Sequence, residues 1–141
     1  MFVLDSDTYT HFLLRQSKVV EKIAAAIARR ETVGITIITK MELLQGRMSA
    51  LLKADSPERF LKAQERLLAT EEAMQQIRIF LLDKSALDHF EQLTNVRGLK
   101  KIGRADLLIA SIARARKAIL VTRNQKHFQV VPQLKLANSV D

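Results

Sequence analysis

Short apolar runs rich in β-branched residues alternate along the chain with longer segments in which apolar positions recur every three to four residues. The runs predict buried strands, at 2–5, 33–38, 78–82 and 118–122. The segment 128–140 offers a further short strand. The longer segments predict amphipathic helices, at 8–14, 17–30, 39–53, 56–77, 84–96 and 104–117.

The helix expected over 39–53 carries an apolar stripe that we expect to face the core. Its members are Met41, Leu44, Met48, Leu51 and Leu52.

Strands separated by helices predict right-handed crossovers and parallel strand pairing. The fold class is therefore α/β, a three-layer α/β/α sandwich with a short, mainly parallel sheet flanked by helices. Because the chain has 141 residues and no linker-like stretch, we expect one domain over 1–141.

Composition and net charge exclude some kinds of site and indicate what the protein binds. There is no cysteine, so disulfides and cysteine-based zinc sites are excluded. No apolar run approaches the roughly 20 residues that span a bilayer, so we expect a cytoplasmic protein without a membrane partner. The net charge of +8 favours a polyanionic partner, either nucleic acid or an acidic protein.

Three carboxylates from distant parts of the sequence are candidates for one site. Asp5 ends the first strand, Glu42 lies in the helix after the second, and Asp106 lies in the first turn of the helix that precedes the fourth. In parallel α/β sheets, ligands bind at the carboxyl ends of the strands. We therefore expect the three side chains to meet at one edge of the sheet.

Each carboxylate also has a purely local explanation. Asp5 and Asp7 can form a turn and cap the following helix. Glu42 follows Thr39 by three residues, which is the spacing of a capping box. Asp106 near a helix N-terminus complements the helix dipole without any chemistry.

Four blocks of sequence, taken in order, are similar to those of one family. FVLDSD ends an apolar strand in Asp5, ITIITKMELLQG contains Glu42 in a Glu-Leu pair before a glycine, and IGRADLLIASIARA places a glycine shortly before Asp106. AILVTRNQKHF follows as the fourth block. With these blocks, nearly the whole chain resembles the PIN-domain ribonucleases, especially the VapC-type toxins of bacterial toxin–antitoxin pairs.

The resemblance implies a PIN-like fold and a metal-dependent endoribonuclease that hydrolyses RNA phosphodiester bonds. Asp5, Glu42 and Asp106 are then the catalytic residues and the ligands of Mg²⁺ or Mn²⁺, a role that suits hard carboxylate oxygens. Thr122 would support Asp5, and Asn124 would hydrogen-bond a water or a phosphate oxygen. The resemblance also implies a small antitoxin partner and a homodimer.

The chain departs from the family pattern at two positions. Asn124 stands where PIN nucleases often have a further acidic residue, and Asp7 stands where Asn is more frequent. We expect Phe128 to lie in the core and do not expect His127 to bind the metal.

Basic residues near the candidate site are expected to hold the RNA backbone. Arg104 ends a basic loop that also contains Arg97, Lys100 and Lys101, and Arg123 follows the fourth strand. We predict that Arg104 and Arg123 bind substrate. The alternative is an ordinary solvated loop.

Two other functions stay open on the sequence alone. A PIN-like module could bind RNA or protein without cutting it. The pair Asp5-x-Asp7 is also similar to the first motif of haloacid-dehalogenase-like phosphatases. That family needs a hydroxylic residue two positions after the second Asp, and here Tyr9 stands there, with Thr8 one position short.

Overall fold

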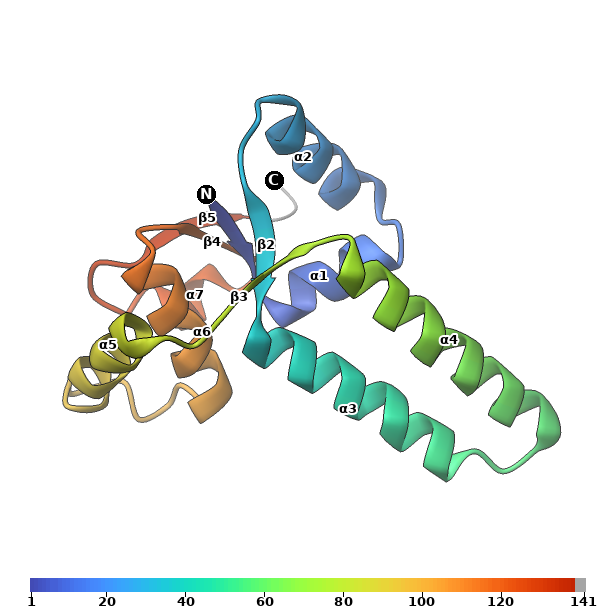
Figure 1. The fold of residues 1–141 in the computed structure, drawn as a ribbon. Coiled ribbons are helices and arrows are strands. Elements are labelled where there is room, and N and C mark those ends of the chain that lie inside the picture. Colours follow the sequence, from blue (N-terminus) through green and yellow to red (C-terminus); the bar gives the residue numbers. More distant parts are fainter. Residues whose placement is uncertain (139–141) are drawn as a thin grey trace.

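The computed structural model describes residues 1–138, in which five strands and seven helices alternate along the chain (Figure 1). The strands are β1 (Phe2–Leu4), β2 (Val33–Thr36), β3 (Arg78–Phe80), β4 (Ile119–Thr122) and β5 (Lys135–Asn138). The helices are α1 (Ser6–Leu13), α2 (Ser17–Ala28), α3 (Ile37–Lys53), α4 (Pro57–Gln75), α5 (Lys84–Thr94), α6 (Arg104–Ala115) and α7 (Gln125–Phe128).

The strands form one sheet in the order β3-β2-β1-β4-β5, and every neighbouring pair is parallel. β1 is central, with Leu4 in register with Ile35 of β2 and Val121 of β4. The predicted parallel sheet is confirmed. The parallel arrangement brings the carboxyl ends of β1, β2 and β4 to the same edge.

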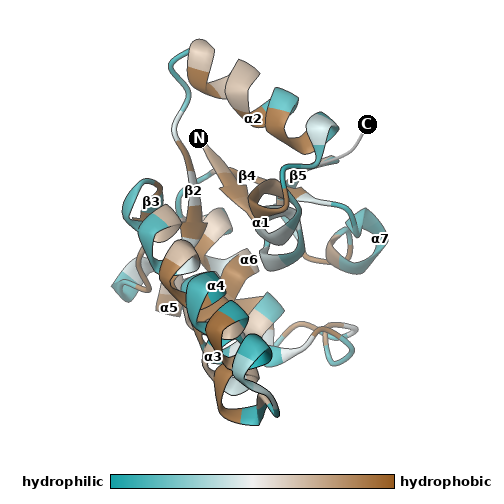
Figure 2. Ribbon diagram, turned by 90° about the vertical axis from the view of Figure 1, so that its right-hand side faces the viewer, coloured by the Kyte–Doolittle hydropathy of each residue, from teal (hydrophilic) through white to brown (hydrophobic). Residues whose placement is uncertain are grey.

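The sheet lies between two layers of helices, each packed on its own core. Successive residues of a strand point to opposite faces, so Val3 packs with the α5 and α6 side chains while Leu4 packs on the other face with Tyr9, Val19 and Ile23. The strands run as hydrophobic ribbons between the helices in Figure 2. The predicted three-layer α/β/α fold is confirmed, and Phe128 lies in the core as expected.

The boundary between the second strand and its helix differs from the prediction. The strand ends at Thr36, not at residue 38, because the Thr36 hydroxyl accepts a hydrogen bond from the Thr39 backbone N–H and caps α3. Thr39 therefore lies inside the helix. The proposed capping box of Thr39 and Glu42 is wrong, and Glu42 has no local capping role.

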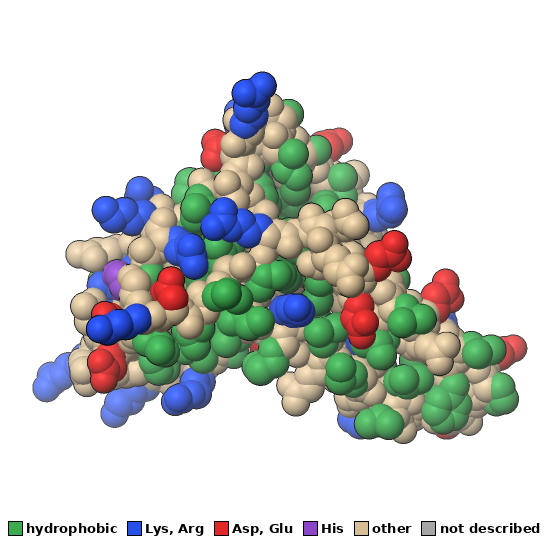
Figure 3. Space-filling view, in the orientation of Figure 1, with side chains coloured by type: hydrophobic (Ala, Val, Ile, Leu, Met, Phe, Trp, Pro, Cys, Tyr) green, Lys and Arg blue, Asp and Glu red, His purple; other side chains and the backbone are tan. Residues whose placement is uncertain are grey.

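The apolar stripe predicted on the third helix is only partly buried. Met41, Met48 and Leu52 are 54%, 48% and 84% exposed. For Met48 and Leu52 the reason is that α3 and α4 form a two-helix arm that extends beyond the sheet (Figure 1), so the outer turns of α3 pack mainly against α4. Figure 3 shows apolar side chains gathered on the visible face of this arm.

The end of the chain forms β5 at the edge of the sheet, within the range expected for a last short strand. Residues 139 and 140 of that expected range, and residue 141 of the expected domain, lie outside the described residues. Within 1–138, no helix combines the length and apolar character that crossing a membrane requires.

Candidate active site

The Asp5 carboxylate lies at the carboxyl edge of the sheet, where β1 passes into α1. It is 6% exposed, and its Oδ1 accepts a hydrogen bond of 2.8 Å from the Thr8 backbone N–H, so it caps α1. The Asp5 backbone N–H donates to the Val121 carbonyl oxygen at 3.1 Å, which fixes the turn against β4. The predicted capping role of Asp5 is thus confirmed.

Burial raises the pKa of the Asp5 carboxyl above its usual value. Hydrogen bonds from Thr122 and Thr8 oppose this rise, and the charge of Asp7 adds to it slightly. Among residues 1–138, no basic group lies within 4.0 Å of the Asp5 carboxylate. Asp5 is therefore a buried acid that is held by neutral hydrogen-bond donors and has no basic side chain beside it among the described residues.

Glu42 is held beside the start of α1 by a serine. The Ser6 hydroxyl lies 2.9 Å from Glu42 Oε1 and 2.9 Å from the Thr39 hydroxyl oxygen. Because Ser6 directly follows Asp5 in the chain, these contacts join the first turn of α1 to α3. They bring Glu42 to the edge where Asp5 lies.

Asp106 lies in the first turn of α6 and pairs with a histidine from α7. The distance between Asp106 Oδ2 and His127 Nε2 is 3.0 Å. The imidazole also meets the Phe128 ring edge-on, with the ring centroids 5.0 Å apart. This contact fixes the ring beside Asp106.

The three acids thus come from elements that meet at one edge of the sheet, and α3 packs against both α1 and α6. In the described part of the chain they do not close into a compact set of three potential metal ligands. Instead, one carboxylate oxygen of Glu42 accepts a hydrogen bond from Ser6. One carboxylate oxygen of Asp106 pairs with His127. The expectation that all three side chains ligate one ion stays a prediction.

The predicted supporting residues lie near Asp5. Thr122 is fully buried and hydrogen-bonds the Asp5 carboxyl. Its hydroxyl oxygen also accepts a bond of 3.0 Å from the Asn124 backbone N–H. The Asn124 side chain is exposed at the start of α7. Both roles remain predictions.

The two predicted substrate-binding arginines have different surroundings. Arg123 contacts the His11 ring, whose Nε2 lies 3.4 Å from an Asp7 carboxylate oxygen. Arg104 lies with its guanidinium carbon 5.3 Å from the centre of the Phe90 ring, on the side where α5 packs against α6. Arg123 is therefore linked to α1 through His11, while Arg104 stacks on an aromatic ring of α5.

Sequence reasoning gave no role to Ser6 or His127, although both contact a candidate acid. The signal for Ser6 was its place between two aspartates at the end of a strand. His127 has no such signal, because only the folding of α7 back onto α6 brings it to Asp106.

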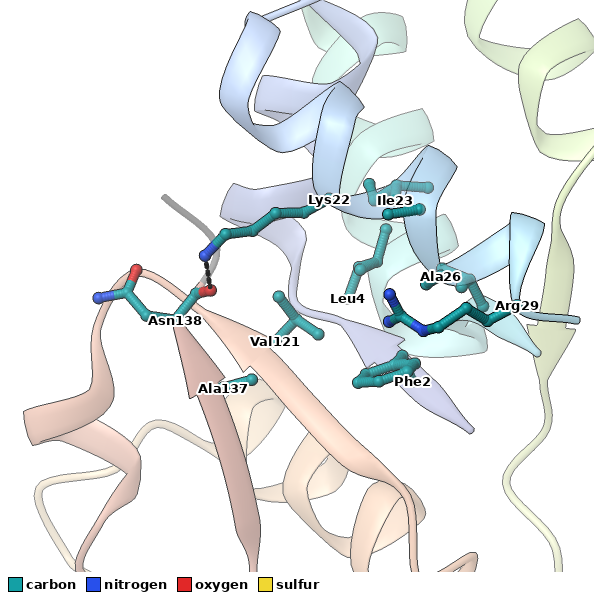
Figure 4. Close-up of a pocket in the computed structure, with 11 residues that line it drawn as sticks. Phe2, Leu4, Lys22, Ile23, Ala26, Arg29, Val121, Ala137 and Asn138 are labelled. Atoms are coloured by element: carbon teal, nitrogen blue, oxygen red, sulfur yellow. Dashed lines mark hydrogen bonds between the residues drawn. The ribbon is translucent and has the colours of Figure 1, made fainter. Parts of the chain in front are cut away.

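A separate apolar pocket of about 310 Å³ lies between α2 and the sheet. Figure 4 shows Leu4, Val121 and Phe2 along one side, and Lys22 donating a hydrogen bond of 3.0 Å to the Asn138 carbonyl oxygen. Among residues 1–138, no acidic side chain lines this pocket. It is therefore not a candidate for the hydrolytic centre.

Comparison with known proteins supports the assignment of the fold. The family model described as PIN domain matches residues 2–134. The chain belongs to the PIN-domain family. No curated protein matches its sequence.

Solved structures similar to this PIN domain include chains of three bacterial complexes. A chain in VapBC2 from Rickettsia felis, bound to a DNA fragment from the promoter of its genes, has 24% identity over 97% of both chains, with a TM-score of 0.77. A chain in DNA-bound VapBC from Salmonella typhimurium has 25% identity over 98% of this chain and 97% of that one, with a TM-score of 0.77. A chain in FitAcB from Neisseria gonorrhoeae has 23% identity over 99% and 98%, with a TM-score of 0.75. The resemblance inferred from the sequence is confirmed in family and fold.

The donor set of the PIN site fits a hard divalent cation. All the candidate ligands are oxygens, from Asp5, Glu42 and Asp106, and such ions prefer carboxylates together with several waters. Asp5 is the strongest of them, because it is a buried carboxylate that lacks a cationic partner among the described residues.

Proposed function

We propose that this PIN domain is a metal-dependent endoribonuclease and acts as the VapC-type toxin of a toxin–antitoxin pair. One observation carries the catalytic part. Asp5 is a buried carboxylate with a raised pKa, held only by neutral donors, at the edge of the sheet to which Glu42 also projects. Burying such a charge is costly unless a cation compensates it.

The residues of the chain divide the work of hydrolysis between them. Asp5 and Asp106 would hold Mg²⁺ or Mn²⁺, which supplies positive charge to the phosphate and makes water more acidic. Glu42 has one oxygen bonded to Ser6, and its other oxygen can accept the proton of the attacking water. The water oxygen then bonds to phosphorus, the bond to the leaving ribose oxygen breaks, and that oxygen takes up a proton from solvent water.

The supporting residues position these acids. Thr122 and the Thr8 N–H hold the Asp5 carboxylate in one orientation, as residues around metal ligands commonly do. Asn124 would hydrogen-bond a water or a phosphate oxygen. Arg123, which follows β4 and contacts His11 of α1, and Arg104 would contact the RNA backbone.

The test is cleavage of RNA by the purified protein with Mg²⁺ or Mn²⁺ and with EDTA. We expect cutting only with metal, and none from Asp5→Asn or Asp106→Asn, because each loses a ligand charge. Asp83→Asn is the matched control, since Asp83 caps α5 through the same contact, Oδ1 to the Ala86 N–H at 2.9 Å, away from the site. Wild-type rates in either site variant would overturn the assignment.

The toxin role rests on similarity to chains of complexes described as VapBC and as toxin–antitoxin complexes. We infer a small antitoxin partner, whose acidic segments would suit the +8 charge, a homodimer, and action on RNA in the cytoplasm. Expression of the protein alone should slow growth, and expression of Asp5→Asn should not. Co-expression with the adjacent gene should restore growth, and sedimentation should give the mass of a dimer. A harmless monomer would contradict this part.

A further inference from the structure

We propose that a basic groove on the α3/α4 arm binds the phosphate backbone of the RNA that flanks the cleaved bond. This inference rests on the proposed function and names a contact surface for its substrate. The groove is separate from the basic loop around Arg104 and from Arg123.

The groove is a hollow of about 290 Å³ between the outer halves of α3 and α4. Its charged lining consists of five cations and one acid: Arg47, Lys53, Arg59, Lys62, Arg66 and Asp55. The rest of the lining is alanine, at positions 50, 54 and 63. A concave surface lined by cations and small side chains suits a phosphate chain.

Most of this charge is not neutralised within the protein. Asp55 pairs with Arg59 at 2.8 Å, and Arg47 bonds the neutral Thr70 hydroxyl through Nε at 3.1 Å. In the described part of the chain, Lys53, Lys62 and Arg66 have no carboxylate within 4.0 Å. The groove therefore carries a net positive charge.

The groove continues toward the candidate acids. Arg47 and Arg66 also line a neighbouring hollow of about 600 Å³, which reaches Thr10 of α1 and Arg15, just after α1. The Thr10 hydroxyl bonds the Ser6 carbonyl, and the Ser6 hydroxyl bonds Glu42. Glu42 and Lys53 lie on one helix, about 16 Å apart along its axis. A strand cut beside Glu42 could therefore extend along α3.

The lining favours RNA over an acidic peptide. Peptide helices bind through large apolar side chains that enter matching pockets, and the only apolar side chains in this groove are alanine methyl groups. The large exposed apolar residues of the arm, such as Met48, Phe60 and Leu68, are not part of its lining. A polyanion near a cluster of carboxylates also needs cations beside it to offset repulsion.

The experiment measures RNA binding in the Asp106→Asn background, where the strand stays intact. A single-stranded RNA oligonucleotide with a fluorescent label is titrated at several salt concentrations, and binding is read as anisotropy. The groove variant is Lys62→Gln with Arg66→Gln. The control is Lys18→Gln with Lys84→Gln, which removes the same charge from exposed positions outside the groove.

Two lost phosphate contacts should lower the slope of log affinity against log salt by about 1.4. At 0.1 M salt that corresponds to roughly 25-fold weaker binding. The control should keep its slope. If the groove variant and the control bind equally, the groove inference is overturned. It is also overturned if the groove variant binds RNA normally and loses only inhibition by an acidic partner.

Cleavage by the wild type separates this inference from the proposed function. If the wild type cuts RNA and the groove variants bind like the control, the nuclease assignment stands and the groove does not. If the wild type cuts no RNA but binds it through the groove, the nuclease assignment fails and the groove stands as an RNA-binding surface without a cleaved bond beside it.

Discussion

Asp5→Asn should leave the metal-free protein as stable as the wild type or more stable. The Asp5 carboxylate is buried, and that burial raises its pKa, so the folded state disfavours its charge. Asparagine keeps the Oδ1 that accepts the Thr8 N–H bond at 2.8 Å. Asp and Asn are equally good at the N-cap position. The substitution therefore removes the cost of a buried charge and preserves the cap.

We expect a gain on the order of 1 kcal/mol in the free energy of unfolding at pH 7, the scale on which a buried, incompletely compensated charge acts. For a chain of this size, that shifts the melting temperature by roughly 3–4 °C. Asp5→Ala removes the same charge but also the capping acceptor of the Thr8 N–H, so it should be about 0.5–2 kcal/mol less stable than Asp5→Asn. The difference between the two variants therefore measures the cap separately from the charge.

The pH dependence gives an independent check. A carboxyl whose pKa is raised by folding stabilises the protein below its unfolded value, near 3.8, and this contribution is lost as pH rises through the folded pKa. The stability of Asp5→Asn relative to the wild type should therefore increase from acidic to neutral pH. Thermal and urea melts in EDTA, between pH 4 and pH 7.5, measure it.

Asp83→Asn is the control for the charge. Asp83 caps α5 in the same way, but it is half exposed and its Oδ2 lies 3.4 Å from Arg116 Nη2. Neutralising it should give no gain. If Asp5→Asn is less stable than the wild type at pH 7, the charge of Asp5 stabilises the metal-free fold and our reasoning is wrong.

Two further predictions concern the metal and the packing of the sheet. Excess Mg²⁺ should raise the melting temperature of the wild type by mass action and that of Asp106→Asn much less, as seen by calorimetry; equal shifts would argue against a site at Asp106. Gly34→Ala should cost about 1–3 kcal/mol or more in urea unfolding, because its Cβ would lie 2.5 Å from the Arg78 carbonyl oxygen and 2.7 Å from the Phe80 ring. Gly46→Ala is the control for Gly34→Ala, because a Cβ at this position of α3 meets open space. It should stabilise the protein by about 0.5–1 kcal/mol, and a loss of stability would make it unsuitable as a control.

The order of elements could be predicted because it depends on local patterns. The α/β class follows from apolar runs and helical periodicity, which each segment carries within itself. The boundary between a strand and the next helix was predicted wrongly where two local signals compete. Ile37 and Ile38 continue an apolar, β-branched run, yet the Thr36 cap ends the strand and starts α3 two residues earlier.

The candidate site was predictable in part. That Asp5 and Glu42 lie at one edge follows from parallel topology, which the alternation of strands and helices already implies. Their contacts do not follow from it. Ser6 bridges α1 to Glu42, and His127 reaches Asp106 across 21 residues of sequence. Such contacts depend on how the helices pack against one another, and local sequence patterns do not predict helix packing.

By itself, the sequence determined the parallel α/β fold, the placement of acids at strand ends and the basic charge, because propensity, periodicity and charge are properties of residues in chain order. Only the tertiary structure decided which apolar residues are buried. Met48 and Leu52 have the spacing of a core stripe, but the α3/α4 arm extends past the sheet, and the described residues leave them 48% and 84% exposed. The tertiary structure also collects Arg47, Lys62 and Arg66 into one groove, because charges distant in sequence act together only when two helices pack side by side.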